Sequence, residues 1–298
     1  MVIRDWSSDV CSSDLIPDSL PLAGNEMIAL DRRISGFLCG TELEDQSLKP
    51  FCHWYWPEQT SLDLRLPPCL TEFLEKTEKT MAHSPSRLLL AGGLCEKTRL
   101  CCAWHLFQGQ GMLFVSDLLS LPDRHLSLHR IFREARLQGL CLFFSKMEAW
   151  EDTLDKEIFA HELEDFPHYV CMSGEGNWDR QMWLHRYPTI SFTLPPLTAE
   201  TRRQMWREYL QDKLHEEEIR MLSARYRFTP AQIHEVASMS GSWGNEGHGL
   251  SASLYEACRS QFSHKLERMA LFIEPKWKWD DLVVPCDTRV QQIGRAHV

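Results

Sequence analysis

Residues 91–98, AGGLCEKT, have residue types and spacing close to those of a phosphate-binding P-loop, G-x-x-x-x-G-K-[ST]. In that loop, backbone N–H groups surround the phosphates of a nucleotide, the lysine reaches the β- and γ-phosphates, and the Ser or Thr hydroxyl holds Mg²⁺. The candidate nucleotide-binding residues are therefore Gly92, Gly93, Lys97 and Thr98.

Two positions of the pattern carry other residues. Ala91 replaces the first glycine, and Glu96 replaces the last, where the main chain of a P-loop approaches the phosphates. At about 4 Å in an effective dielectric of ~20, the Glu96 carboxylate and a phosphate charge would repel by roughly 4 kcal/mol. That is about half of the ~8 kcal/mol that binds a micromolar ligand. The loop is a working site, a decayed site or a coincidental match, and these residues favour a decayed site.

ATP hydrolysis by a P-loop enzyme needs a carboxylate at the end of a neighbouring strand. The sequence has no carboxylate at that position. In such enzymes an Asp at the end of a neighbouring strand holds Mg²⁺. The corresponding stretch here, LCLFFSKMEA, ends its apolar run at Ser145 and Lys146, and the nearest acid, Glu148, is out of register. We therefore predict no catalytic residue and no metal site in this chain.

Other polar residues come at positions where the P-loop domains that this turn resembles contact phosphate. Ser173 and Asn177 follow an apolar strand, and a hydrogen bond inside their loop is favoured over contact with a phosphate. His125 and His129 are four apart on a predicted helix, but no third metal ligand is near in sequence, so a solvated helix face is favoured. The later helices carry further candidates, of which the two arginines are predicted to face solvent: Gln232, His234, Arg225 and Arg227.

Short apolar runs alternate with amphipathic stretches through the middle of the chain, which predicts a parallel sheet covered by helices on both faces. The five predicted strands are 87–91, 111–116, 140–145, 168–173 and 189–194. The predicted helices around them are 25–39, 69–83, one after Lys97, 126–138, 151–164 and 178–186. Four more helices follow the last strand, at 199–214, 216–226, 230–239 and 250–271, with a loop at 241–249.

Composition excludes some classes of protein. The net charge is −10, and no basic field covers the chain, so nonspecific nucleic-acid binding is not favoured. No apolar run approaches the roughly 18–20 residues that span a bilayer. The cysteines form no C-x-x-C pair, and several lie in strand-like runs, which is typical of reduced, buried thiols in a cytoplasmic protein.

The two ends have the sequence of translated sequencing adapter. The closing QIGRAHV fits codons that contain the start of a widely used adapter, and DWSSDVCSSDL near the beginning fits its reverse complement. We therefore predict that 1–15 and 292–298 are artefacts and exclude them from the fold. Without their charged residues (Arg4, Asp5, Asp9, Asp14 and Arg295) the net charge changes from −10 to −9.

The order of these elements resembles an AAA+ ATPase, with a P-loop sheet followed by a helical lid. Two stretches, LYEACRSQFSHKLERMALFIEPKWKWDDLVVP (254–285) and IFREARLQG (131–139), resemble the AAA+ ATPases associated with phage-tail-like contractile injection systems. In those proteins an IEP-x-x-x-WDDLVLP-like segment links a first, often degenerate, ATPase-like domain to an intact second one. The resemblance implies an N-terminal helical segment (16–84), a P-loop-like α/β core (85–197), a lid (198–272) and a linker (273–291) toward a missing second ATPase domain.

The resemblance also implies partners and cofactors. Family members bind ATP and Mg²⁺, whereas the degenerate P-loop leads us to expect that this fragment uses neither. The implied partners are the missing C-terminal ATPase domain and further copies in a homo-oligomeric ring, with no nucleic acid and no membrane, in the cytoplasm. An adaptor or scaffold on a P-loop fold without a nucleotide role is the alternative, and a DNA-associated motor is disfavoured by the acidic charge.

Overall fold

A computed structural model of the chain describes residues 31–266, except 42–43, 59–61, 63, 108, 117–119, 122, 150–152, 176–186, 211–213 and 244–249. The chain divides into two compact units, Met1–His234 and Glu235–Val298. The predicted helix 178–186, the linker 273–291 and both adapter-like ends lie outside the described residues. The predicted domain boundaries remain predictions.

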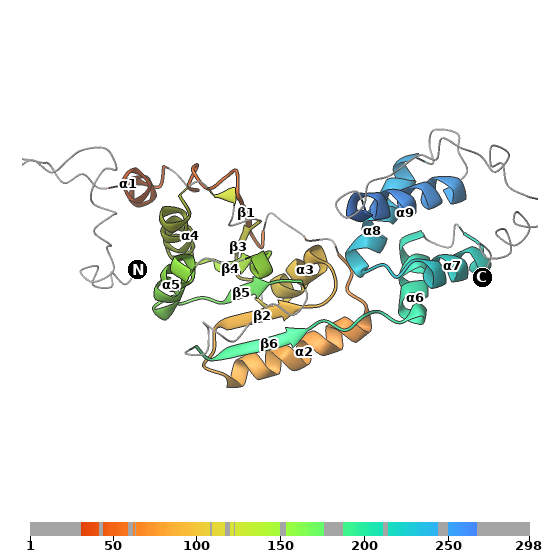
Figure 1. The fold of residues 1–298 in the computed structure, drawn as a ribbon, viewed down its shortest axis with the longest axis horizontal. Coiled ribbons are helices and arrows are strands. Elements are labelled where there is room, and N and C mark those ends of the chain that lie inside the picture. The colour runs from red at the N-terminus through yellow and green to blue at the C-terminus, as the bar shows by residue number, and fades with distance from the viewer. Residues whose placement is uncertain are drawn as a thin grey trace, which may run out of the picture. The chain divides into compact units, whose positions relative to one another are not determined.

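A six-stranded sheet in the order β1-β3-β4-β5-β2-β6 forms the centre of the first unit (Figure 1). The five predicted strands are confirmed, and their pairings with one another are all parallel. The segment 16–84, predicted to be helical, also contains a sixth strand, which pairs antiparallel with β3. The strands are β1 Cys52–Tyr55, β2 Leu88–Gly92, β3 Met112–Val115, β4 Cys141–Phe144, β5 Val170–Ser173 and β6 Thr189–Thr193.

The described helices follow the predicted ones closely. The loop predicted at 241–249 is wrong at its start, because α8 continues to Trp243. The helices are α1 Arg32–Cys39, α2 Pro68–His83, α3 Glu96–Leu106, α4 Arg124–Gln138, α5 Thr153–Glu164, α6 Ala199–Leu210, α7 Glu216–Arg225, α8 Pro230–Trp243 and α9 Leu250–Leu266.

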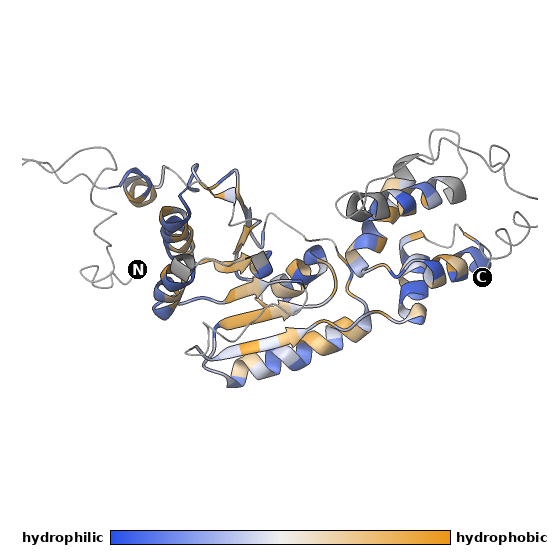
Figure 2. Ribbon diagram, viewed as in Figure 1, coloured by the Kyte–Doolittle hydropathy of each residue, from blue (hydrophilic) through white to orange (hydrophobic). Residues whose placement is uncertain are grey.

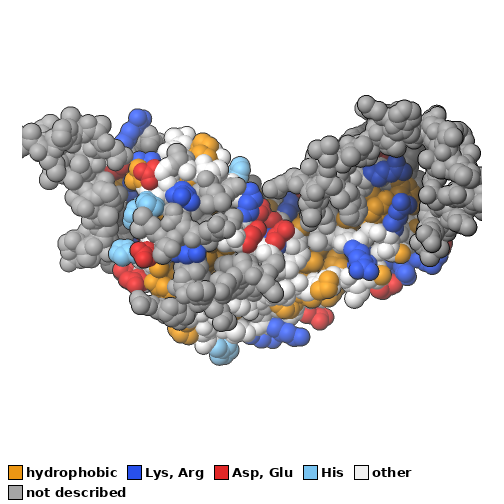
Figure 3. Space-filling view, viewed as in Figure 1, with side chains coloured by type: hydrophobic (Ala, Val, Ile, Leu, Met, Phe, Trp, Pro, Cys, Tyr) orange, Lys and Arg blue, Asp and Glu red, His pale blue; other side chains and the backbone are white. Residues whose placement is uncertain are grey.

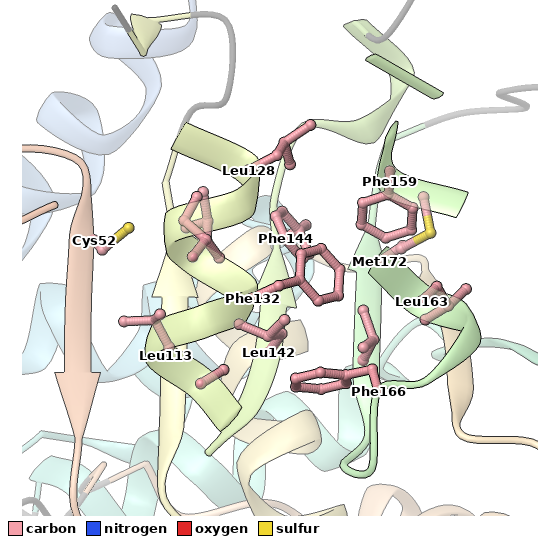
Figure 4. Close-up of a cluster of buried hydrophobic side chains, with 14 of the residues drawn as sticks. Cys52, Leu113, Leu128, Phe132, Leu142, Phe144, Phe159, Leu163, Phe166 and Met172 are labelled. Carbon is pink, nitrogen blue, oxygen red and sulfur yellow. The ribbon is translucent and has the colours of Figure 1, made fainter. Parts of the chain in front are cut away.

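Two hydrophobic layers cover the two faces of the sheet. Figure 2 shows the apolar colour of the central strands. Alternate side chains of the central strands point to opposite faces, so every residue of β2 to β5 is buried. One face packs against α4 and α5, where Phe132 lies 5.4 Å from Phe159 and 5.2 Å from Phe166 between ring centroids (Figure 4). The other face packs against α2 and α3.

The IFREARLQG stretch of α4 serves as a clamp in this structure. The Glu134 carboxylate accepts hydrogen bonds from Arg33 Nε (2.8 Å) and Nη2 (2.9 Å) on α1, and both side chains are buried. Arg133 contacts Asp45 at 3.0 Å, and Arg136 donates to Glu162 of α5 at 2.6 Å. A motif that carried the family resemblance therefore holds α1, the turn at residue 45 and α5 onto one helix.

The cysteines agree with the prediction of reduced thiols. Each of the nine cysteines in the described ranges is a free thiol, and six of them are buried: Cys52, Cys101, Cys102, Cys141, Cys171 and Cys258. Burial raises the pKa of the Cys141 thiol to about 12, so this group stays protonated at neutral pH.

Candidate nucleotide site

The P-loop-like residues form the turn between β2 and α3, which confirms the predicted strand–turn–helix context. β2 ends at Gly92 and α3 begins at Glu96. Gly93 has a φ of +75°, and a Cβ atom there would lie 2.4 Å from the carbonyl oxygen of Leu194, so only glycine fits. Leu94 also has a positive φ, 47°, a conformation that is strained for a residue with a side chain.

The two side chains that define the motif differ in their surroundings. Lys97 is exposed, whereas Thr98 is completely buried. The Thr98 hydroxyl accepts a hydrogen bond from the Ala231 backbone N–H at 3.4 Å and lies 3.2 Å from the Cys95 thiol. Cys95 is in turn 3.0 Å from the hydroxyl of Thr229. The hydroxyl that would hold Mg²⁺ in a working P-loop therefore caps the first turn of α8 instead.

Two of the candidates on the later helices, Gln232 and His234, contact other side chains or the backbone of the protein. The Gln232 amide oxygen accepts hydrogen bonds from the backbone N–H and the hydroxyl of Thr229, both at 3.0 Å, and so helps to begin α8. The His234 ring makes an edge contact with Tyr209 at 5.3 Å. Arg225 and Arg227 are exposed, as predicted.

Arg99 is the important residue that sequence reasoning missed. Its side chain is 1% exposed, and its guanidinium donates to the carbonyl oxygens of Gly93 (3.1 Å) and Leu94 (2.7 Å) and to the Ser173 hydroxyl (2.6 Å). Arg99 therefore holds the strained turn from inside the protein. A signal was present, because the residues three, four and seven places after Arg99 on the same helix face are apolar: Cys102, Ala103 and Leu106.

Ser173 is thus engaged by Arg99, so its hydrogen-bond partner lies on α3 and not inside its own loop as predicted. Asn177 lies outside the described residues.

Glu96 and Ser145 lie together at the carboxyl end of the sheet. Burial raises the pKa of the Glu96 carboxyl, while a hydrogen bond with Ser145 and the positive charges of Arg99 and Lys146 oppose that rise. The Ser145 hydroxyl also donates to the carbonyl of Ser116. Glu96 therefore places its own carboxylate at the strand end where a P-loop enzyme keeps an Asp, next to the turn that would hold phosphate.

Glu148 does not join this pair, because its carboxylate accepts the backbone N–H of Glu175 at 3.1 Å. His129 contacts Glu162 through Nδ1 at 2.5 Å, which gives it a role in packing α4 onto α5. Among the described residues, no group of three or more His, Cys, Asp and Glu side chains could hold a metal ion.

The charge of the surface and the length and polarity of the helices concern binding to nucleic acid and to membrane. On the face drawn in Figure 3, Lys and Arg side chains are interspersed with acidic and apolar ones. Within the described ranges, every helix is too short or too polar to cross a membrane.

Replacing Thr98 by valine is expected to lower the free energy of unfolding by about 1–2 kcal/mol without any nucleotide present. Valine keeps the shape of the side chain but leaves the buried Ala231 N–H without its acceptor. Urea unfolding followed by circular dichroism measures the loss. Thr80→Val on the exposed side of α2 is the matched control, with a change within about 0.5 kcal/mol. Equal stability of the two variants would contradict the capping role.

The later helices match a family model. The family model described as "Contractile injection system ATPase helical domain" matches residues 198–264, which contain α6, α7, α8 and most of α9. The match confirms the predicted resemblance to an AAA+ ATPase of contractile injection systems.

Solved AAA structures resemble the chain at low identity. A structure from work on katanin self-assembly has a TM-score of 0.50 and 13% identity, over 78% of this chain and 93% of that chain. The FIGL-1 AAA domain in complex with ADP has a TM-score of 0.48 and 13% identity, over 74% of this chain and 94% of that chain. The katanin similarity supports a P-loop NTPase-like α/β fold and, at this identity, the fold alone. No curated protein matches the sequence significantly.

Proposed function

We propose that this chain is the N-terminal ATPase-like domain of an AAA+ ATPase of contractile injection systems, with a degenerate P-loop that does not hydrolyse ATP. The family match at 198–264 and the P-loop NTPase-like sheet support the family. The contact of the Thr98 hydroxyl with the backbone N–H of Ala231 on α8 is the observation that carries the proposed loss of hydrolysis, because this hydroxyl is the group that would hold Mg²⁺.

The cofactors of the family, ATP and Mg²⁺, do not fit the residues that are present. A phosphate at the turn would meet the Glu96 carboxylate, and Mg²⁺ would find Ser145 where an Asp is needed. Arg99 already holds the carbonyl groups of the turn and the Ser173 hydroxyl. The domain is therefore proposed to keep its fold without a nucleotide.

The proposed role is structural or regulatory. A domain of this kind would pack within a homo-oligomeric ring in the cytoplasm and would support a second, intact ATPase domain that follows it. An uninterrupted gene sequence with an intact P-loop and strand-end Asp downstream of Val284 would favour this role over an independent adaptor.

Isothermal titration of the chain with ATP and Mg²⁺ is expected to give weak or no binding, and a phosphate-release assay no turnover. Glu96→Gly removes the repelling charge and is expected to strengthen any binding, whereas Lys97→Ala is expected to remove it. Arg227→Ala, an exposed change on the lid side, is the matched control and should leave binding unchanged. A micromolar dissociation constant together with turnover in the unchanged chain would overturn the proposed function.

A further inference from the structure

The P-loop-like turn and the start of α8 are joined through residues 95–98 and 229–231. The two segments are 134 residues apart in the sequence from Cys95 to Thr229, and both belong to the first compact unit. We propose that their contacts form a latch, so that the turn and the start of α8 open only together. The proposal rests on the proposed function, because it gives the turn a regulatory role in place of a nucleotide role.

Cys95 lies at the centre of the latch. It directly precedes α3, but its side chain caps none of the backbone N–H groups of that helix. The thiol lies 3.0 Å from the Thr229 hydroxyl and 3.2 Å from the Thr98 hydroxyl, so one sulfur atom connects the two segments. Because Cys95 is half-buried and Thr98 is completely buried, these contacts form where the dielectric is low and hydrogen bonds are stronger than in water.

A second hydrogen bond runs beside the thiol contacts. The Ala231 N–H belongs to the first turn of α8, whose N–H groups have no carbonyl partner inside their own helix. It donates to the Thr98 hydroxyl at 3.4 Å, and Ala231 is 1% exposed, so water does not replace this acceptor. Separating the two segments would therefore leave a buried donor without a partner, which is costly.

Each segment is also held by bonds of its own. On the side of the turn, Arg99 donates to two carbonyl oxygens of the turn. On the side of α8, the Gln232 amide oxygen accepts the N–H and the hydroxyl of Thr229, and the His234 ring packs edge-on against Tyr209 of α6. Since two fixed segments share the latch contacts, a displacement of one is passed to the other.

Hydrogen exchange of the whole chain, followed by NMR without a nucleotide, tests the latch because each segment has its own reporter. The Arg99 N–H, bonded to the Cys95 carbonyl at 3.0 Å, reports on the turn, and the Ile233 N–H, bonded to the Thr229 carbonyl at 3.0 Å, reports on α8. Cys95→Ala should speed exchange at both reporters by about fivefold, the effect of losing one hydrogen bond. Thr229→Val, made on the other side of the latch, should do the same.

Three further variants serve as controls. Cys69→Ala and Thr80→Val make the same kinds of change at exposed positions of α2, and they should leave exchange at Arg99 and Ile233 unchanged. Cys95→Ser keeps a hydrogen-bonding group and should stay closer to the unchanged chain than Cys95→Ala does. Melting curves check that each variant keeps its fold, and Thr229→Val tests the coupling by itself if Cys95→Ala unfolds.

Faster exchange at both reporters, whichever side carries the substitution, supports the latch. Faster exchange confined to the segment that carries the substitution, or unchanged exchange at both reporters, overturns it. ATP turnover by the unchanged chain, the result that would overturn the proposed function, is measured in a separate assay, so the two failures are distinguishable.

Discussion

Replacing Glu134 by alanine is expected to lower the free energy of unfolding by about 3–5 kcal/mol, the cost of leaving one partner of a buried ion pair charged and alone. The Arg33 side chain is 5% exposed, and both of its hydrogen bonds to Glu134 would be lost. Urea unfolding followed by far-UV circular dichroism gives the change. Glu75→Ala, an exposed acid-to-alanine change on α2, is the control and should stay within about 0.5 kcal/mol.

A double variant tells whether the loss comes from the stranded charge. Arg33→Met combined with Glu134→Leu replaces the pair by apolar side chains, and such replacements are often neutral or stabilising. The double variant should therefore recover most of the stability that Glu134→Ala loses. A loss below about 1 kcal/mol for Glu134→Ala alone would mean that Arg33 reaches water, which contradicts the buried clamp.

Replacing Arg99 by methionine is expected to lower the free energy of unfolding by about 2–4 kcal/mol. Methionine keeps an apolar stem of similar length but leaves the carbonyl groups of Gly93 and Leu94 and the hydroxyl of Ser173 without their donor. Each buried group without a partner costs about 1–3 kcal/mol, and relaxation of the turn reduces the sum. Urea unfolding measures the loss, and limited proteolysis within 92–96 should become faster.

Two further measurements make the role of Arg99 specific. Arg225→Met removes an exposed guanidinium that lies over the Tyr226 ring, and it should change stability by less than about 0.5 kcal/mol. Mg²⁺-ATP should not restore the stability of Arg99→Met, because the turn is held by the protein and not by a ligand. Restoration by the nucleotide would show that the turn still binds phosphates.

The strands that position the site were predictable because they are buried on both faces. A run such as LLLAG is apolar without interruption, which is what a central parallel strand requires. β1 was missed for the opposite reason. Of its four residues, CHWY, only Cys52 is fully buried; they lie near prolines and pair antiparallel at the edge, so neither length nor composition marked them.

The hydrogen-bond partners of the site residues were harder to predict than the positions of those residues in the motif. The sequence placed Lys97 and Thr98 at the right spacing, but the partner of Thr98 is a backbone N–H more than a hundred residues away. The spacing of residues in the sequence describes local geometry only. The hydrogen-bond donor that a hydroxyl contacts is set by the tertiary fold. Arg99 shows the same limit, because its acceptors are main-chain carbonyls, which have no residue type to recognise.

The antiparallel pairing of β1 has a practical consequence for anyone who shortens this protein. β1 covers the outer edge of β3 through all four residues, Met112 to Val115. A fragment that begins at residue 85, where the P-loop-like core was predicted to begin, would bare the N–H and C=O groups of that edge. Open edges of apolar strands pair with other chains, so such a fragment is expected to aggregate during expression. The smallest fragment worth purifying therefore begins before Asp31, so that it contains both β1 and the helix that α4 holds.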